Sequence, residues 1–314
     1  MKEILKASSS PHIRHPETTR GIMADVVIAL LPAAVFGCIL FGIHAVLVLL
    51  VCVAVSVLSE FLWNLILKKP NSVGDFSAVV TGLLLGMNLS PKIPLWMAAI
   101  GSFAAIIIVK QMFGGLGHNF VNPAIAARII LMVSFPSAMN RFIDPIFSTG
   151  KTAGIITSAT PLSDPSAGIS LKYAFFGLYR GCIGETSAFL LLIGGAYLVI
   201  RKIISPAIPL SFLGTVAVLS LLTGANAPMQ LFTGGLMLGA IFMATDYTTS
   251  PTSLLGKIIF GIGCGAITFA IRKYGSLPEG VSYSIILMNI ATPLINRFTL
   301  RKPFGFVKEV KADE

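Results

Sequence analysis

Ten strongly apolar segments constrain what this chain can fold into. Several reach the ~20 residues that a helix needs to cross ~30 Å of hydrocarbon. Their apolar runs are continuous and do not alternate in polarity, which favours helices over a β-barrel. The sequence therefore predicts an all-α integral membrane protein of about ten transmembrane helices, at residues 22–42, 44–67, 76–90, 94–112, 120–135, 186–202, 207–223, 231–245, 255–272 and 281–298.

The balance of side chains excludes a soluble domain. Hydrophobic residues make up 55% of the chain and charged residues 11%, whereas soluble domains typically carry about 25% charged residues. The excess of 23 basic over 13 acidic side chains would also suit a nucleic-acid-binding protein. However, the charges lie between apolar runs and form no basic cluster with interleaved aromatics. We therefore expect membrane lipid around the chain and no nucleic-acid partner.

A stretch of mixed polarity separates two apolar halves. We interpret residues 1–135 as an N-terminal membrane half, 136–185 as an extracytoplasmic loop and 186–314 as a C-terminal membrane half. Around Thr160 the loop is rich in small, hydroxylated and turn-forming residues, which cannot bury enough apolar surface to cross a bilayer. By spacing alone Thr160 is a turn residue, because no adjacent His or Lys would activate its hydroxyl.

Basic residues set the predicted orientation, because short cytoplasmic loops carry an excess of Lys and Arg. With the N-terminus inside, the short outer loops hold only Lys92, Arg272 and Lys273, whereas the inner side holds most of the others, Lys110 among them. Both termini are therefore expected in the cytoplasm of a multi-pass protein of the cell (inner) membrane, with the central loop outside.

The two halves resemble each other in sequence. Residues 82–86 (GLLLG) lie in the third segment of the first half, and residues 235–239 (GLMLG) lie in the third segment of the second. Because each half has five segments, the second must start from the opposite face, which predicts a five-plus-five inverted repeat. Paired short segments broken by glycine, here helices 3 and 8, point to a site near the midplane. Close packing of helices is the alternative role of these glycines.

Acidic residues near the membrane are candidates for ion handling, because a charge at the bilayer centre costs at least ~2.5–3.5 kcal/mol without a partner. Asp246 is the ion-coupling candidate, since it ends the short eighth segment beside several hydroxyl groups that suit Na⁺ or a proton relay. A cap or turn role is its alternative. Glu60 lies deep in the second segment, where an internal hydrogen bond would satisfy it equally well. Asp25 and Asp75 open their segments and suit helix N-termini.

A glycine-rich stretch at residues 114–123 (GGLGHNFVNP) leads into the fifth segment. Its glycines allow close backbone approach, and its amides supply hydrogen bonds. These properties suit a re-entrant turn that lines a cofactor pocket. They suit equally an ordinary turn before a helix that begins near Pro123. No Cys, His, Asp or Glu spacing indicates a metal site.

Four motifs together make the chain similar to a known family. They are SATPL at 158–162, GGLGHNFVNPA at 114–124, GGLMLGAIFMATDYTTSP at 234–251 and PEGVSYSIILMNIATPLI at 278–295. The chain resembles the D component of the Rnf ion-translocating ferredoxin:NAD⁺ oxidoreductase complex, whose family also includes the B component of the Na⁺-translocating NADH:quinone reductase. The resemblance extends over nearly the whole sequence.

The resemblance implies a flavoprotein. It implies FMN esterified through its phosphate to Thr160, within a motif that includes Ser158 and Ala159, and attached by a flavin transferase. It also implies a noncovalent riboflavin between helices, near the paired short segments. The other Rnf subunits would be partners in a hetero-oligomer that relays electrons from ferredoxin to NAD⁺ and moves Na⁺ or H⁺. We expect negative charge that arrives near the midplane to favour cation uptake at Asp246.

Two other classes of function remain open from the residues alone. A flavin-free transporter or channel for small solutes also suits an inverted repeat. A purely structural anchor for partner subunits would show neither flavin nor transport.

Overall fold

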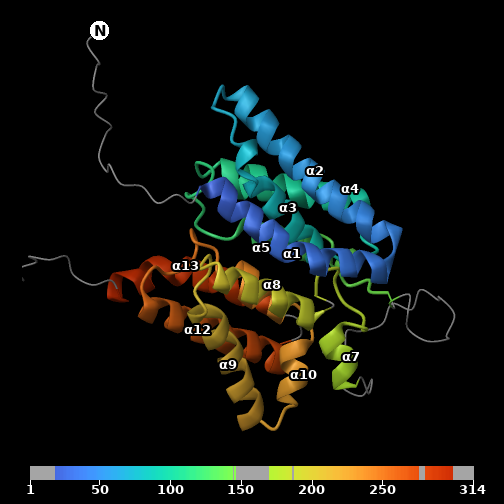
Figure 1. Cartoon of the computed structure of the whole chain (residues 1–314), viewed down its shortest axis with the longest axis vertical. Coiled ribbons are helices and arrows are strands. Elements are labelled where there is room, and N and C mark those ends of the chain that lie inside the picture. Colours follow the sequence, from blue (N-terminus) through green and yellow to red (C-terminus); the bar gives the residue numbers. More distant parts are fainter. Residues whose placement is uncertain (1–17, 144, 146–169, 186, 276–279, 300–314) are drawn as a thin grey trace, which may run out of the picture.

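The computed structural model describes residues 18–143, 145, 170–185, 187–275 and 280–299 (Figure 1). The predicted flavin-attachment residues Ser158, Ala159 and Thr160 lie outside the described residues. The first half is built from α1 (Thr19–Phe41), α2 (Ile43–Ile66), η1 (Val73–Asp75), α3 (Ser77–Met87), α4 (Leu95–Phe103), the π-helix η2 (Ala104–Gln111) and α5 (Pro123–Ser134).

Two short helices belong to the central stretch, and the second half combines long helices with short ones. The described residues contain helices and no strands, which confirms the predicted all-α class. The remaining elements are α6 (Pro136–Met139), α7 (Leu171–Phe176), α8 (Ala188–Ile200), α9 (Ala207–Leu222), α10 (Ala227–Phe232), α11 (Leu236–Leu238), the π-helix η4 (Gly239–Met243), α12 (Leu254–Tyr274) and α13 (Val281–Thr299).

Each of the ten predicted apolar segments contains a helix, but the helices differ in length. Within the described residues, α1, α2 and α12 are long and apolar enough to cross a membrane, and five further apolar helices are shorter. At a rise of 1.5 Å per residue, the 11 residues of α3 extend only about 16 Å. The matching segment of the second half is divided between α11 and η4, with 3 and 5 residues.

Helix packing follows the same scheme in both halves. In the first half α2 packs on α3 and α4, and in the second α9 packs on η4 and α12. Across the boundary, α1 contacts α8 and α5 contacts α13 (Figure 1). Each helix of these two cross-pairs thus meets the helix at the same position in the other half.

The ends of the helices fall into two groups. A hydrogen bond of 2.8 Å between Ser253 and Thr299 joins the start of α12 to the end of α13, and an ion pair of 3.0 Å between Arg201 and Asp25 joins the end of α8 to the start of α1. At the opposite end of the bundle, Arg272 in the last turn of α12 donates to a carbonyl of α10. Both described termini therefore lie at one end of the molecule, and α7 lies at the other (Figure 1).

The end of the predicted central loop is buried between the halves. The backbone N–H groups of Ile183 and Gly184 donate to the carbonyls of Leu89 and Met87, at 3.2 and 2.7 Å. The Tyr179 hydroxyl donates to the Glu185 carbonyl at 2.8 Å. Residues 179–185 are therefore fixed to the end of α3, although the domain boundaries themselves stay a prediction.

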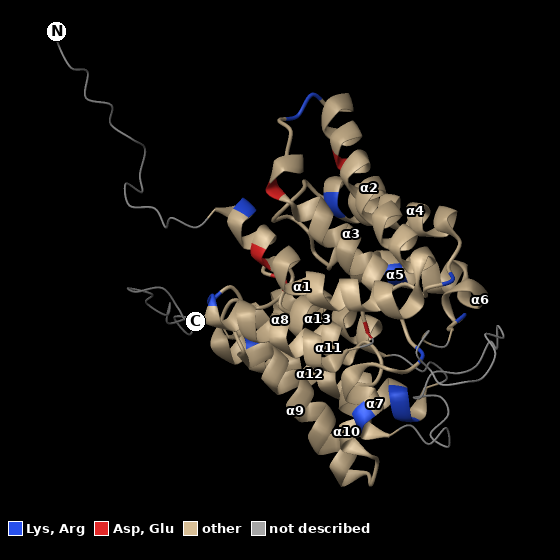
Figure 2. Cartoon of the chain, turned by 45° about the vertical axis from the view of Figure 1, so that its right-hand side comes forward, with Lys and Arg blue, Asp and Glu red and all other residues tan. Residues whose placement is uncertain are grey.

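Few charged residues lie along the described helices (Figure 2), and two buried pairs, Glu60 with Lys110 and Glu185 with Arg128, join oppositely charged side chains inside the bundle. The Lys110 side chain is 1% exposed and donates to both carboxylate oxygens of Glu60, at 3.0 and 2.9 Å. Ser72 and Gln111 donate to the same carboxylate. Glu60 is thus satisfied internally, which was one of its two predicted roles. Placing Lys110 in an inner loop was wrong, because the π-helix η2 directs it into the protein.

We predict that losing one partner of the Glu60–Lys110 pair destabilises the protein more than losing both charges. Lys110→Met leaves a buried carboxylate without a cation, which costs about 3–5 kcal/mol. In Lys110→Met/Glu60→Gln the amide oxygen still accepts from Ser72 and Gln111, so most of that loss should return. Thermal unfolding of the purified protein in detergent measures both. A double variant no more stable than the single one would contradict this account.

Candidate functional site

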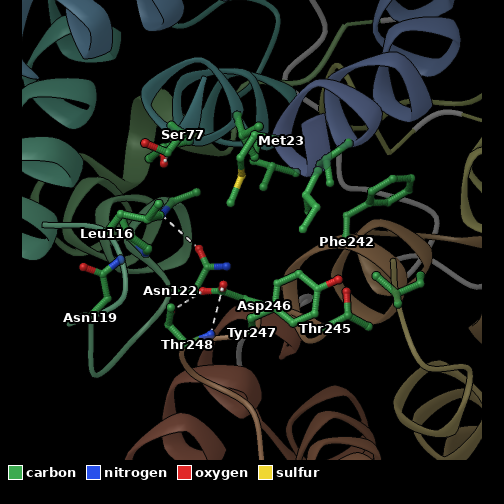
Figure 3. Close-up of a pocket in the computed structure, with 18 of the residues that line it drawn as sticks. Met23, Ser77, Leu116, Asn119, Asn122, Phe242, Thr245, Asp246, Tyr247 and Thr248 are labelled. Carbon is green, nitrogen blue, oxygen red and sulfur yellow. Dashed lines mark hydrogen bonds between the residues drawn. The ribbon is translucent and has the colours of Figure 1, made fainter. Parts of the chain in front are cut away.

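A cavity lies where the two halves meet, bounded by elements from both (Figure 3). From the first half come α1, α3, the end of η2 and the stretch that leads into α5. From the second half come the end of α8 and residues 242–248, which include the end of the π-helix η4. Its volume is about 90 Å³, and one water needs roughly 10–15 Å³ of such space. The cavity therefore has room for several waters or a partly hydrated cation.

Asp246 reaches this cavity because η4 ends at Met243 and the chain then turns. The Asp246 carboxylate accepts hydrogen bonds from the backbone N–H of Thr248 at 3.4 Å, from the Thr248 hydroxyl at 3.2 Å and from the Thr249 hydroxyl at 3.3 Å. These donors are neutral, so they orient the carboxylate without cancelling its charge.

No ion pair among the described residues involves Asp246. Lys110 lines the same cavity, but its ammonium group donates to both oxygens of Glu60 and to the Ser77 hydroxyl, at 2.6 Å for the latter. All three donors of that ammonium group are therefore engaged away from Asp246. Among the described residues, the Asp246 carboxylate is thus contacted by neutral donors and by no cation.

Two asparagines from the glycine-rich stretch also line the cavity. Asn122 caps α5, because its side-chain oxygen accepts from the N–H groups of Ala124 and Ile125 at 3.0 and 3.3 Å. Its amide nitrogen donates to the Met243 carbonyl at 3.3 Å, which ties α5 to the end of η4. Figure 3 shows the Asn122 and Asp246 side chains pointing into the same space.

Asn119 supplies the second amide, and its side-chain oxygen has no hydrogen-bond partner among the residues that the structure describes. The residue is 7% exposed, and this oxygen is buried without a hydrogen bond among the described residues. An unsatisfied buried acceptor costs about 1–3 kcal/mol. Asn119 lines the cavity, so its side-chain amide is a candidate contact for a ligand, an ion or water there.

The walls and the polar groups together define what the cavity can bind. Val80, Leu84, Leu116 and Phe242 form apolar walls, whereas the polar oxygens come from one carboxylate, hydroxyls and amides. Hard cations prefer oxygen ligands of these kinds. Within the described part of the chain, no group of three or more His, Cys, Asp or Glu side chains could hold a metal ion. The arrangement therefore suits a monovalent cation or a proton better than a transition metal.

A second buried charged centre lies at the other end of α3. Arg128 in α5 donates to Glu185 at 3.0 Å and to the Asn88 side chain at 2.7 Å. The sequence placed Arg128 inside an apolar segment but did not identify its partner. A buried cation needs an anion, but Glu185 directly precedes the sixth apolar segment, 57 residues away in the chain, so the sequence did not indicate this pairing.

The other predicted acids have structural roles. Asp75 accepts from the backbone N–H of Ser77 at 2.8 Å, as expected for a residue that opens a helix. Asp25 pairs with Arg201 at the end of the bundle. Of the acids predicted as candidates, Asp246 is the one that the described structure places in the cavity wall and outside its ion pairs.

Comparison with known proteins identifies the family. A family model described as the NQR2, RnfD, RnfE family matches residues 6–305. The chain is 49% identical to a protein of Acetobacterium woodii named as the D component of a Na⁺-translocating ferredoxin:NAD⁺ oxidoreductase complex, over 97% of this chain and 96% of the relative. It is 44% identical to a protein of Clostridium ljungdahlii named as the D component of a proton-translocating ferredoxin:NAD⁺ oxidoreductase complex, over 97% of each.

A third relative, from Stutzerimonas stutzeri, is 37% identical over 90% of this chain and 91% of its own length, and is named as the D component of an ion-translocating oxidoreductase complex. The family that the four sequence motifs predicted is thereby confirmed. Since both the family model and these relatives match almost from end to end, the chain belongs to the NQR2, RnfD, RnfE family.

Proposed function

We propose that this chain is the membrane-embedded D component of an ion-translocating ferredoxin:NAD⁺ oxidoreductase complex and that it couples electron transfer to cation movement at Asp246. Near full-length similarity to subunits of that name supports the complex. The observation that carries the coupling role is a half-buried carboxylate without a cationic partner among the described residues, in a cavity between the two halves. Ferredoxin, NAD⁺ and the remaining subunits are the partners that follow.

The proposed architecture is a five-plus-five inverted repeat of about ten membrane helices. The matching helix pairs support it, as do the short third and eighth segments. Both termini are proposed to be cytoplasmic and residues 136–185 to be extracytoplasmic. The position of both described ends of the chain at one end of the bundle, opposite α7, agrees with that orientation.

The proposed covalent cofactor is FMN on Thr160, attached by a flavin transferase, with Ser158 and Ala159 in the attachment motif. A bound flavin supplies one- and two-electron redox chemistry. The contribution of the chain is to hold it at a fixed end of the bundle. Residues 179–185 follow the attachment segment and are hydrogen-bonded to the end of α3. These bonds would fix the end of the bundle at which the flavin is held.

The noncovalent riboflavin is proposed to occupy the cavity between the halves. Its apolar walls match the faces of an aromatic ring system, and Asn119 and Asn122 match polar atoms at a ring edge. Since the cavity of about 90 Å³ would have to widen, this assignment rests on the chemistry of the lining residues. The Asn119 side-chain amide, which lines the cavity, is the group that would contact such a ligand.

Coupling is proposed to follow from charge balance around Asp246. Two charges 4 Å apart interact by about 4 kcal/mol at the effective dielectric constant of roughly 20 that suits protein interiors. Negative charge gained in this cavity therefore strengthens the attraction of the Asp246 carboxylate for a cation. The Thr248 and Thr249 hydroxyls can replace part of the hydration shell of that cation. One relative is named as part of a Na⁺-translocating complex and another as part of a proton-translocating complex. Uptake of both cations should therefore be measured.

Thr160→Ala should abolish covalent flavin. The protein is expressed with its flavin transferase, and its intact mass and in-gel fluorescence after denaturation are measured. Wild type should carry one FMN less one water, because a phosphoester forms with loss of water. Thr157→Ala, in the same segment, serves as the matched control and should keep the adduct. An unchanged adduct in Thr160→Ala would rule out this attachment site. A protein without flavin that still transports ions would favour a flavin-free transporter or channel.

Asn119→Leu should reduce the flavin that the purified protein releases on denaturation and leave the covalent flavin unchanged. The reason is that the substitution removes the amide oxygen that lacks a described partner while keeping a similar volume. Noncovalent flavin is measured in the supernatant after precipitation, against Asn140→Leu at an exposed position. Equal release from both variants would show that riboflavin lies elsewhere.

Asp246→Asn should uncouple ion transport from electron flow. In vesicles that contain the reconstituted complex, cation uptake per electron transferred should fall roughly tenfold or more, because a Coulomb attraction of a few kcal/mol is lost. Flavin content should stay unchanged, and Asp246→Glu should restore part of the transport. Unaltered uptake of both Na⁺ and H⁺ in Asp246→Asn would contradict a coupling role for this residue.

A further inference from the structure

A second cavity lies behind the loop that carries Asp246. Its volume is about 190 Å³, and its lining includes several polar side chains. Thr245, Tyr247 and Ser250 contribute from this loop, Ser205 from the entrance to α9, and Thr252 and Lys257 from the start of α12. Asp246 itself lines the first cavity and not this one.

Two long helices begin at this second cavity. The α9 helix starts at Ala207 and has 16 residues, and α12 starts at Leu254 and has 21. The first N–H groups of a helix have no partner within the helix, and its N-terminus carries partial positive charge. The Ser253 hydroxyl accepts from the Gly256 N–H at 3.0 Å, and the Ser205 hydroxyl accepts from the Ala207 N–H at 3.4 Å. The partial positive charge of the two helix ends is therefore what they offer to an anion in this cavity.

The side chains that line this cavity add positive charge and a free hydroxyl. Lys257, in the first turn of α12, is half-buried and has no acidic partner among the described residues. Ser250 is only 8% exposed, and its hydroxyl makes no hydrogen bond within the described part of the chain, although its backbone N–H donates to the Asp246 carbonyl at 3.1 Å. This hydroxyl, on a residue that lines the cavity, is therefore available to donate to a ligand there.

We propose that this second cavity binds a phosphate group. Lys257 and the first turns of α9 and α12 supply the positive potential, and Ser250 supplies a hydroxyl donor. Lys is a common phosphate ligand in proteins, acting as a point charge. The phosphate can belong to a lipid headgroup or to a soluble compound. Leu210 and Leu254, on the flanking helices, are 68% and 66% exposed, which would suit the acyl chains of a lipid.

The test uses the purified complex in detergent, with Lys257→Gln, Ser250→Ala and Lys257→Arg. Lys273→Gln, in the last turn of α12, is the matched control. One arm titrates inorganic phosphate against chloride at equal ionic strength and follows the unfolding temperature. The other counts bound phosphatidylglycerol by native mass spectrometry, with uncharged diacylglycerol as the comparison.

Wild type should bind at least one of the two probes, and Lys257→Gln should weaken that binding roughly tenfold, since a charge-assisted hydrogen bond is lost. Lys257→Arg and Lys273→Gln should bind as wild type does, and Ser250→Ala more weakly. Protection by inorganic phosphate would identify a soluble ligand, and retention of phosphatidylglycerol alone would identify a lipid headgroup. Binding of neither probe, or equal binding in Lys257→Gln, would overturn the proposal.

Discussion

The cost of a charge without a partner in an apolar interior determines how this molecule is built. Its helices expose apolar side chains on their outer surfaces, so water does not satisfy the polar groups inside. The Glu60–Lys110 and Arg128–Glu185 pairs meet this constraint by joining distant parts of the chain. Among the described residues, Asp246 meets it through hydroxyl and backbone donors alone. That difference separates two structural carboxylates from Asp246, at which we propose that a cation binds.

Local pattern was sufficient to predict the helices and their approximate ends. Continuous apolar runs and flanking turn residues depend on neighbours in sequence, and each of the ten segments contains a helix. The short third and eighth segments were predicted for the same reason, since glycine spacing and segment length are local properties. Asp246 was also a local inference, because its hydroxyl neighbours follow it directly in the chain.

Contacts between distant residues could not be read from the sequence. Lys110 was placed in a loop because a basic residue after an apolar run usually lies there, and the π-helical turn that buries it leaves no plain sequence signal. Its partner is 50 residues away. Asn119 and Asn122 were noticed only as part of a glycine-rich stretch, because their importance depends on η4 and the end of α8 lying opposite. Nothing local indicates that arrangement.

The cavity between the halves and the loop at residues 244–251 connect the proposed functions. Thr245 and Tyr247 line both cavities, so the loop that presents Asp246 to the first also forms part of the proposed phosphate site. An anion bound in the second cavity would stabilise this loop without contacting the Asp246 carboxylate. The two sites would thus share one structural element at the boundary between two similar halves.

Infrared difference spectroscopy of the purified complex tests most directly whether Asp246 takes up a cation. Spectra recorded on addition of Na⁺, and on reduction at fixed pH, report changes in carboxylate and protonated carboxyl bands. The account predicts such a band in wild type and its disappearance in Asp246→Asn, with the flavin bands retained. The same carboxyl bands in both proteins would contradict the central claim.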